Sequence, residues 1–214
     1  MDAFTTARRC MVETQLRRQG IRDERVLSAM ENVPRERFVP ADQQPFACDD
    51  RALPIDSGQT ISQPWVIAVM LEALGLQPGD NVLEVGSGCG YVLALLARLA
   101  GRVQGIERHA GLATDASARL AALGIEADVM HGDGTEGWPS RAPFDAIIVS
   151  AAAADVPPAL LEQLSPGGRL IMPVGDAADH QRLLVIERGH DGSFVERALF
   201  PVRFVPLVAG SLQD

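Results

Sequence analysis

The chain has 214 residues, of which 47% are hydrophobic, and this is enough to bury the core of one α/β domain. Its net charge of −9 and its pI of about 4.9 argue against an extended nucleic-acid surface, which is usually basic. The chain contains no apolar run of membrane-spanning length and no secretory signal, so we expect a cytoplasmic protein without a membrane partner.

The N-terminal part is predicted to be helical. Apolar residues recur at helical spacing over 4–19 and 22–32, and prolines follow the second segment. Two arginine pairs, at 8–9 and 17–18, lie in the first helix, either on a solvated face or as a local basic patch. Residues 40–64 are irregular, and a loop of this length inside a compact domain is often functional.

The irregular stretch ends in the sequence GQTISQP, directly before a predicted helix over 65–75. From spacing alone, Ser62 can be the N-cap of this helix, with Pro64 or Trp65 as its first residue. The spacing alone does not show whether Ser62 is a helix N-cap or a residue of a functional site.

A glycine-rich loop joins the next strand and helix. The apolar run 81–85 predicts a buried strand, and the Leu- and Ala-rich segment 91–100 predicts a helix. Between them the glycines let the backbone turn tightly and let a ligand approach it. Their spacing lacks both the G-x-G-x-x-G of a dinucleotide site and the G-K-[ST] of a phosphate loop. The pattern E-x-G-x-G-x-G instead resembles the loop of methyltransferases that use S-adenosylmethionine.

Two acidic residues follow the next two predicted strands. Glu107 ends a strand over 102–107, where an acid can accept hydrogen bonds from ribose hydroxyls; a solvated acid is the alternative. Asp133 follows a strand over 126–131, where it can accept from an adenine amino group or form a plain Asp-Gly turn. Both residues are expected at the carboxyl edge of the sheet, close to the first glycine, Gly86.

The remaining segments complete an α/β pattern. We expect a buried strand over 144–150, a helix near 157–164, a turn at SPGG and a strand over 169–175. Segments 182–188 and 194–207 flank a D-G turn and are typical of a hairpin. Alternating strands and helices followed by late antiparallel strands predict a doubly wound sheet with a modified C-terminal edge.

Segments in the same order along nearly the whole chain resemble the protein-L-isoaspartate O-methyltransferase family. They include MVETQLRRQGI, VPRERFVP, GQTISQP, PGDNVLEVGSGCGY, GDGTEGW and VRFVPL. The resemblance implies one Rossmann-like methyltransferase domain over residues 1–214. Its expected parts are N-terminal helices with a substrate loop (1–77), a cofactor-binding core (78–175) and a C-terminal β region (176–214).

The resemblance also implies the reaction. S-adenosylmethionine would give its methyl group to the α-carboxylate of L-isoaspartyl residues in damaged proteins and peptides, leaving S-adenosylhomocysteine. A carboxylate is already ionised at pH 7, so no general base is expected. The methyl ester can then form a succinimide without the enzyme, which reopens a route to normal aspartate. We expect a monomer that binds no nucleic acid and needs no metal.

The family motif assigns the site residues. Ser62 is expected to be the active-site residue that orients the carboxylate. The expected cofactor contacts are Gln59, Thr60, Ile61, Gly86, Ser87, Gly88, Glu107, Asp133 and Gly134. Cys48 stands where the family often has an aromatic residue, and Asp56 stands where it often has glycine. These departures leave open a different carboxylate substrate, and a non-catalytic protein that binds isoaspartyl residues or S-adenosylmethionine is a third possibility.

The cysteines and histidines predict no further chemistry. Three cysteines, far apart and odd in number, form no C-x-x-C pair and no cluster with histidine, so neither a disulfide framework nor a zinc site is predicted. The histidines are expected to be solvated or structural; they are His109, His131, His180 and His190.

Overall fold

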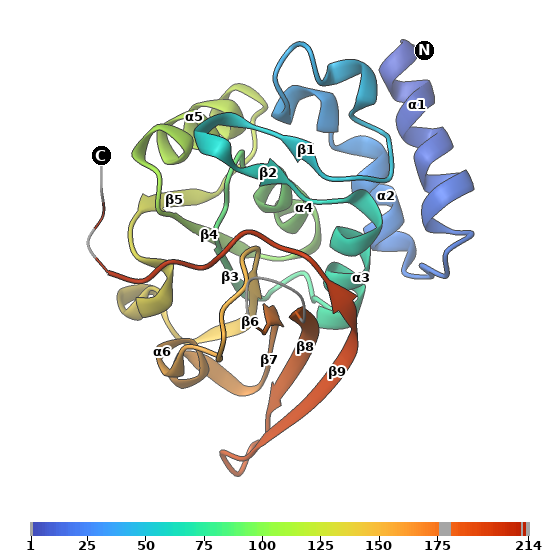
Figure 1. Ribbon diagram of the computed structural model, residues 1–214. Coiled ribbons are helices and arrows are strands. Elements are labelled where there is room, and N and C mark those ends of the chain that lie inside the picture. The colour runs from blue at the N-terminus through green and yellow to red at the C-terminus, as the bar shows by residue number, and fades with distance from the viewer. Residues whose placement is uncertain (1, 176–180, 211, 213–214) are drawn as a thin grey trace.

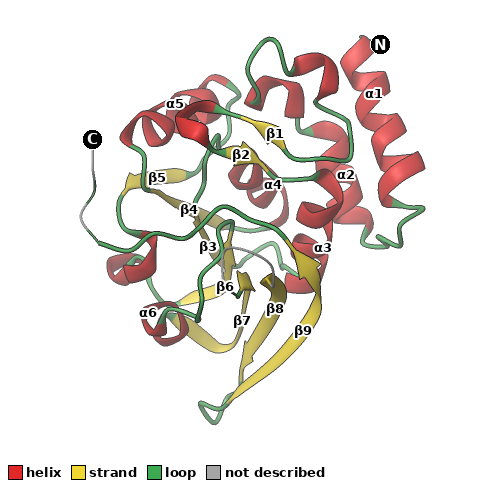
Figure 2. Ribbon diagram, in the orientation of Figure 1, coloured by secondary structure: helices red, strands yellow, loops and turns green. Residues whose placement is uncertain are grey.

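The computed structural model describes residues 2–175, 181–210 and 212 (Figure 1). Its centre is one sheet of seven strands (Figure 2). The strands are β3 (Asn81–Val85), β4 (Arg102–Glu107), β5 (Asp128–His131), β6 (Phe144–Val149), β7 (Leu164–Val174), β8 (Gln181–Arg188) and β9 (Phe194–Val202). They lie in the order β5-β4-β3-β6-β7-β8-β9. The first five pair in parallel, while β8 and β9 are antiparallel to their neighbours.

Helices cover both faces of this sheet. They are α1 (Ala3–Met11), a π-helical turn (Val12–Leu16), α2 (Glu24–Asn32), α3 (Pro64–Leu74), α4 (Tyr91–Leu99), α5 (Ala110–Ala122) and α6 (Pro158–Glu162). Because successive strand side chains point to opposite faces, each strand contributes to two cores. Val82 packs in the core shared with α3, α4 and α5, whereas Leu83 and Val85 pack in the core under α6.

The order of the strands places a binding edge. The chain runs from β3 outward through β4 to β5, and then β6 returns to the other side of β3. Ligands of doubly wound sheets bind at the carboxyl ends of the strands where the order reverses. This topology confirms the predicted doubly wound sheet with an antiparallel C-terminal edge.

The N-terminal helices differ from the prediction in two respects. The predicted helix over 4–19 is shorter, because α1 passes into the π-helical turn that ends at Leu16. The expected solvated face or basic patch is wrong for Arg8, which is buried. Its guanidinium pairs with Glu36 and donates to the Glu31 carbonyl 2.8 Å away. This arginine therefore ties α1 to the segment after α2.

The stretch 40–64 is more ordered than predicted. It contains a two-stranded ribbon in which β1 (Leu53–Pro54) pairs antiparallel with β2 (Thr60–Ile61). A short 3-10 turn joins them, and Ser57 in this turn has a φ of +57°. The ribbon carries the GQTIS segment across the edge of the sheet (Figure 1).

Several C-terminal boundaries are corrected. SPGG is not a turn before a strand but lies inside β7, where the pairing with β6 shifts register and Gly167 has a φ of +83°. A bulge thus absorbs the residues that suggested a turn. The helix near 157–164 is only α6, β5 begins at Asp128 rather than 126, and β9 ends at Val202 rather than 207. The expected boundary at 175/176 and His180 touch residues outside the described ranges.

The packing of Gly105 in β4 makes a stability prediction. A Cβ at this position would lie 2.7 Å from Leu93 Cδ1 and 3.1 Å from Ser87 Cβ. Gly105→Ala should therefore lower the free energy of unfolding by about 1–3 kcal/mol, as overpacked cores do. Gly111→Ala is the control because nothing lies within 4 Å of its Cβ, and it should be neutral or stabilise by about 0.5–1 kcal/mol. Urea denaturation measures both, and equal stabilities would contradict the packing argument.

Candidate functional site

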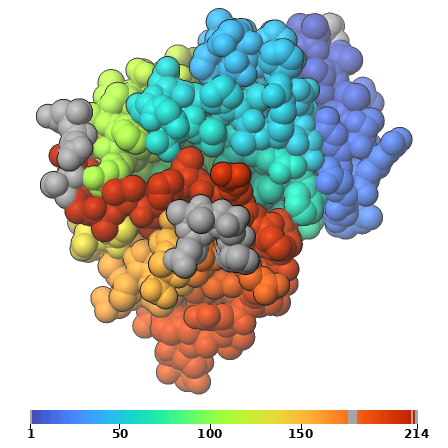
Figure 3. All heavy atoms as spheres, viewed as in Figure 1, coloured from blue at the N-terminus to red at the C-terminus, as the bar shows by residue number. Residues whose placement is uncertain are grey.

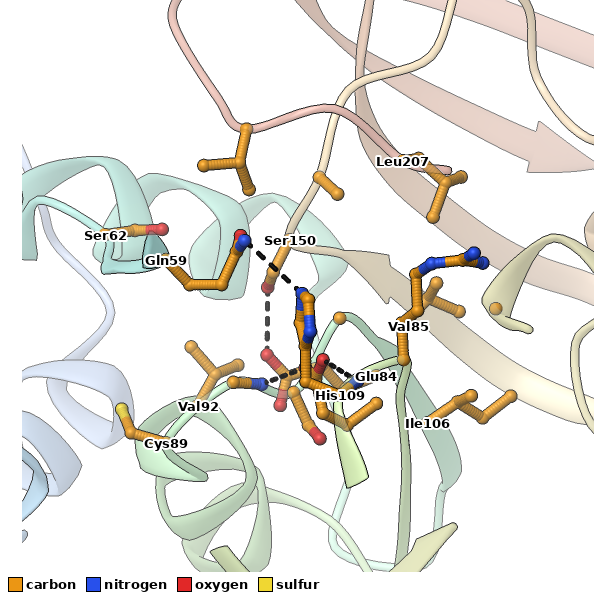
Figure 4. A pocket seen from close by; sticks show the side chains of 18 of the residues that line it. Gln59, Ser62, Glu84, Val85, Cys89, Val92, Ile106, His109, Ser150 and Leu207 are labelled. Atoms are coloured by element: carbon orange, nitrogen blue, oxygen red, sulfur yellow. Dashed lines mark hydrogen bonds between the residues drawn. The ribbon is translucent and has the colours of Figure 1, made fainter. Parts of the chain in front are cut away.

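A cavity of about 250 Å³ lies at the carboxyl ends of β3, β4 and β6. Its wall contains nine of the ten predicted site residues. These are Gln59, Thr60, Ile61, Ser62, Gly86, Ser87, Gly88, Glu107 and Gly134. Figure 4 shows Ser62 and Gln59 on one side and Leu207 on the other, with Glu84 and His109 between them. The structure thus brings together residues that are up to 75 positions apart in the sequence.

The glycine loop has the tight backbone turn that its glycines predicted. Gly86, Gly88 and Gly90 have φ values of +78°, +52° and +86°, a region that side chains disfavour. The N–H groups of Gly86 and Ser87 donate to the Ile106 carbonyl at 2.8 and 3.1 Å. The loop is therefore fixed against β4 and presents its backbone to the cavity.

Glu107 holds two loops together. One carboxylate oxygen accepts from the Gly88 N–H at 2.7 Å, and the other accepts from the His109 N–H at 2.9 Å. Glu107 is buried, so the alternative of a solvated acid at the end of the strand is wrong. Each oxygen keeps a further lone pair for a ligand hydroxyl.

Glu84 is a site residue that the sequence analysis missed. It lies at 1% exposure before the glycine loop, and its Oε1 accepts from the Ser150 hydroxyl at 2.9 Å (Figure 4). Its Oε2 is buried without a hydrogen-bond partner. Burial raises the pKa of Glu84 to about 8, because the charged form loses water. The acidic first position of the E-x-G-x-G-x-G pattern was the available signal.

His109 was also missed. It lines the cavity, and its Nε2 lies 3.4 Å from Gln59 Nε2, which links the ribbon to the end of β4 (Figure 4). The expectation that all histidines are solvated or structural is therefore incomplete. His131, by contrast, has a structural contact, a 2.9 Å hydrogen bond between its Nε2 and the Arg108 carbonyl.

Asp133 is the one predicted residue that does not line the cavity. One of its oxygens accepts from the N–H and hydroxyl of Thr135 at 2.9 and 2.7 Å, and the other accepts from the Gly210 N–H at 2.6 Å. It therefore forms a local turn and also anchors the end of the chain. Its contact with adenine stays a prediction.

The C-terminal segment 203–210 crosses the site as a cover. Ala152 exchanges two backbone hydrogen bonds with it, to Val205 and Leu207, at 2.8 and 2.7 Å. Figure 3 shows the segment, in red, on the surface between the cyan part of the chain and the yellow and orange part. Residues 205–208 line the cavity, which explains the position of the FVPL motif.

Ser62 stands where the cavity meets a second one. This groove, of about 410 Å³, is lined by Trp65 and by residues 200–205, and Ser62 lines both cavities. The N-cap interpretation of Ser62 is wrong, because the N-cap of α3 is Gln63. Among the described residues nothing hydrogen-bonds the Ser62 hydroxyl, so it is available to a ligand.

The cavity fits S-adenosylmethionine by the chemistry of its wall. Three polar atoms of its lining residues, Glu84 Oε2, Ser87 Oγ and Tyr91 Oη, are buried without a hydrogen-bond partner, which is costly unless a ligand or water bonds to them. A carboxyl and a hydroxyl suit the charged amino-acid end of that molecule, and Glu107 suits ribose hydroxyls. No cluster of lysine or arginine suited to a diphosphate lines the cavity, whose one described cation is Arg108.

The fold and this cavity define the class: a Rossmann-like methyltransferase that uses S-adenosylmethionine. The family model described as protein-L-isoaspartate(D-aspartate) O-methyltransferase (PCMT) matches residues 7–212. The chain belongs to this family.

Similar relatives and solved structures carry the name of the same family. A protein-L-isoaspartate O-methyltransferase of Methylorubrum extorquens (strain PA1) is 55% identical, over 95% of this chain and 89% of the relative. One of Serratia proteamaculans (strain 568) is 53% identical, over 93% and 95%. A solved protein-L-isoaspartate O-methyltransferase superimposes with a TM-score of 0.85 at 29% identity, covering 95% of this chain and 67% of that one. A Plasmodium falciparum PCMT in complex with S-adenosyl-L-homocysteine gives 0.81 at 27% identity, covering 94% and 98%.

The two departures from the family pattern lie outside the site. Neither Cys48 nor Asp56 lines the cavity or the groove, and Asp56 is exposed at the start of a 3-10 turn. They therefore give no structural support to a different substrate. Among the described residues, every helix is too short or too polar to cross a membrane.

The raised pKa of Glu84 predicts how stability depends on pH. The unfolded side chain loses its proton near pH 4.5, whereas the folded one keeps it up to about pH 8. In this window the folded state binds the extra proton, so the stabilisation is complete below pH 4.5 and is lost as pH rises through 8. The slope is at most about 1.4 kcal/mol per pH unit. Glu84→Gln should remove this loss in urea denaturation between pH 5 and 9, and an unchanged profile would contradict the assignment.

Proposed function

We propose that Ser62 binds the α-carboxylate of an L-isoaspartyl residue and holds it next to the S-adenosylmethionine cavity for methyl transfer. The activity is that of the family: this enzyme methylates isoaspartyl residues of damaged proteins, and its cofactor is S-adenosylmethionine. The observation that carries the proposal is that Ser62 is one of four residues that line both the cavity and the groove, with Thr60, Ser150 and Val205, and that its hydroxyl has no hydrogen-bond partner among the described residues.

The cofactor side of the site would be built from the sheet. Glu84, Ser87 and Gly88 would hold the amino-acid end, Glu107 would accept from the ribose, and Gly134 would leave room for the base. The bound cofactor supplies an electrophilic methyl group on a positively charged sulfur. The protein residues bind and orient this group, and none of them forms a bond with the methyl carbon.

On the substrate side of the site, the reaction mainly requires that the protein hold the carboxylate in position. The attacking carboxylate is ionised at neutral pH, so no side chain has to remove a proton. Ser62 would donate its hydroxyl to one carboxylate oxygen and leave the other free to attack. Ser62 is not assigned as a covalent nucleophile, since within the described residues no histidine hydrogen-bonds its hydroxyl.

Exclusion of water would contribute the rest. A carboxylate and a sulfonium react to neutral products, so water, which stabilises the charged reactants, slows the step. Residues of the ribbon over 53–61 and of segment 203–210 both line the cavity and cover it. These covers, and the residues that line both cavities, support a reaction driven by proximity and desolvation.

The groove would hold the peptide on either side of the isoaspartyl residue. Its wall is largely apolar and includes an aromatic pair, Trp65 and Phe200, with ring centroids 4.8 Å apart and ring planes tilted by 35°. Its one charged lining residue among those described is Arg203. A wall of this composition suits an extended peptide of varied sequence better than one specific small metabolite. We also propose that the protein acts as a cytoplasmic monomer. Its net charge of −9 supports the absence of a nucleic-acid partner.

Methyl transfer to a synthetic peptide tests the role of Ser62. The purified protein should transfer labelled methyl from S-adenosylmethionine to a short peptide with L-isoaspartate, as a base-labile ester. The same peptide with normal aspartate should stay unlabelled. Ser62→Ala should lower kcat/KM about 10- to 100-fold, since one oriented hydrogen bond to the reacting group is lost.

The outcomes separate the two halves of the proposal. Unlabelled isoaspartyl peptide, with cofactor binding confirmed, would contradict the substrate. Full activity of Ser62→Ala would keep the substrate and remove Ser62 from the site.

Cofactor affinity tests the role of Glu107. Glu107→Gln replaces one acceptor oxygen by a donor that faces a backbone N–H and should weaken S-adenosylmethionine binding about tenfold by calorimetry. Glu72→Gln is the matched control, because Glu72 also accepts from two backbone N–H groups, those of Arg22 and Asp23, at 2.7 Å each. It lies outside the cavity and should leave affinity within twofold of wild type. Equal affinity of all three proteins would contradict the assignment of Glu107.

A further inference from the structure

Arg35 is a fully buried cation next to the proposed site. It lies in the 3-10 turn Arg35–Phe38 at 0% exposure. Its Nε donates to the Ala47 carbonyl at 2.8 Å, and its Nη2 donates to the Ser62 carbonyl at 2.7 Å. The residue thus joins the turn after α2 and the segment around Ala47 to the backbone of Ser62, the residue that is to hold the carboxylate.

The same guanidinium reaches the cofactor loop. Its central carbon lies 4.8 Å from the centroid of the Tyr91 ring. Tyr91 is the first residue of α4, directly after the glycine loop, and it lines the cavity. Arg35 therefore lies between Ser62 on the substrate side and the start of α4 on the cofactor side.

No carboxylate neutralises this charge in the described part of the chain. The neighbouring Glu36 pairs with Arg8 instead. One nitrogen of Arg35, Nη1, is buried without a hydrogen-bond partner. Burying an arginine without a counter-ion is costly, and an apolar side chain would join the same segments at a lower cost. Unlike an apolar side chain, the guanidinium is a rigid planar donor. It binds two carbonyl groups at once while it lies over the Tyr91 ring.

We propose that Arg35 is a positioning residue for methyl transfer, which fixes the main chain of Ser62 against the start of α4. This inference rests on the proposed function, because it acts through the Ser62 hydroxyl. Without the guanidinium, the fold can still bind the cofactor, whose contacts come from the sheet loops. The Ser62 hydroxyl would lose its fixed place at the junction of cavity and groove.

The test compares Arg35 with an arginine of similar contacts elsewhere. Arg25 also donates to two backbone carbonyls, those of Leu76 and Leu99, and it joins α2 to the ends of α3 and α4. It lines neither cavity. Arg35→Met and Arg35→Lys are measured beside Arg25→Met, with kcat and KM for an isoaspartyl peptide and Kd for S-adenosylmethionine.

The expected result is a loss confined to catalysis. Arg35→Met should lower kcat about 10- to 100-fold, the cost of misplacing a reacting group by about an ångström, with the cofactor Kd within twofold of wild type. The kcat of Arg35→Lys should lie between those of Arg35→Met and wild type, because an ammonium keeps the charge but cannot form the planar fork of donors. Arg25→Met should lose stability but keep kcat and KM within twofold. Wild-type kcat in both Arg35 variants would overturn the proposal.

A double-mutant cycle shows whether Arg35 acts through Ser62. If it does, Arg35→Met in the Ser62→Ala background should reduce kcat less than threefold, since the hydroxyl it positions is already gone. If the kcat losses of the two single variants instead multiply in the double variant, the proposal is overturned and Arg35 has a role separate from that of Ser62. If Arg35→Met fails to fold, the same cycle with Arg35→Lys decides. A Ser62→Ala variant with wild-type activity would instead contradict the proposed function itself.

Discussion

The carboxylate of Glu107 accepts backbone hydrogen bonds from Gly88 and His109, and the cofactor cavity depends on this contact. It joins the loop after β3 to the loop after β4, so that the ends of two parallel strands become one wall. The positive φ values of the loop glycines allow the backbone to come this close. Glu84, near the end of β3, also belongs to this wall, and its carboxyl group accepts a hydrogen bond from Ser150, which follows β6.

Around this rigid wall, segments from both ends of the chain are brought in. Ser62 follows the ribbon, between β2 and α3. Segment 203–210 returns from β9 at the far edge of the sheet, and Ala152 after β6 and Asp133 after β5 bind it as it crosses the carboxyl ends of the strands. The antiparallel β8 and β9 make that return possible, because they turn the chain back toward the carboxyl edge (Figure 1). The modified edge of the fold thus has a function, since it supplies one side of the site.

The parts of this arrangement that follow from local sequence could be predicted. Strand and helix order, the glycine loop and the position of Glu107 depend on short apolar runs and on glycine, and they were found. The motif of the family also located Ser62, although its spacing to Pro64 equally suggested an N-cap.

The parts that depend on contacts between distant residues could not be predicted in this way. The side chain of Asp133 is engaged by Gly210, which is 77 positions away, and no local pattern reports such a contact. Arg8 was expected on a solvated face or in a basic patch because its neighbour is also arginine, but it is buried, where it pairs with Glu36. SPGG has the composition of a turn, but the pairing of β7 with β6 overrides that preference. Arg35, in an ordinary-looking RERF stretch, becomes notable only when its burial is known.

The proposed reaction requires that the substrate carboxylate and the cofactor meet at Ser62. A crystal structure with S-adenosylhomocysteine and an isoaspartyl peptide tests it most directly. The peptide is expected to lie in the groove along Trp65 and 200–205, with an oxygen of its α-carboxylate within hydrogen-bonding distance of Ser62 Oγ. A peptide bound elsewhere, or a carboxylate in the groove that is held by other residues, would contradict it.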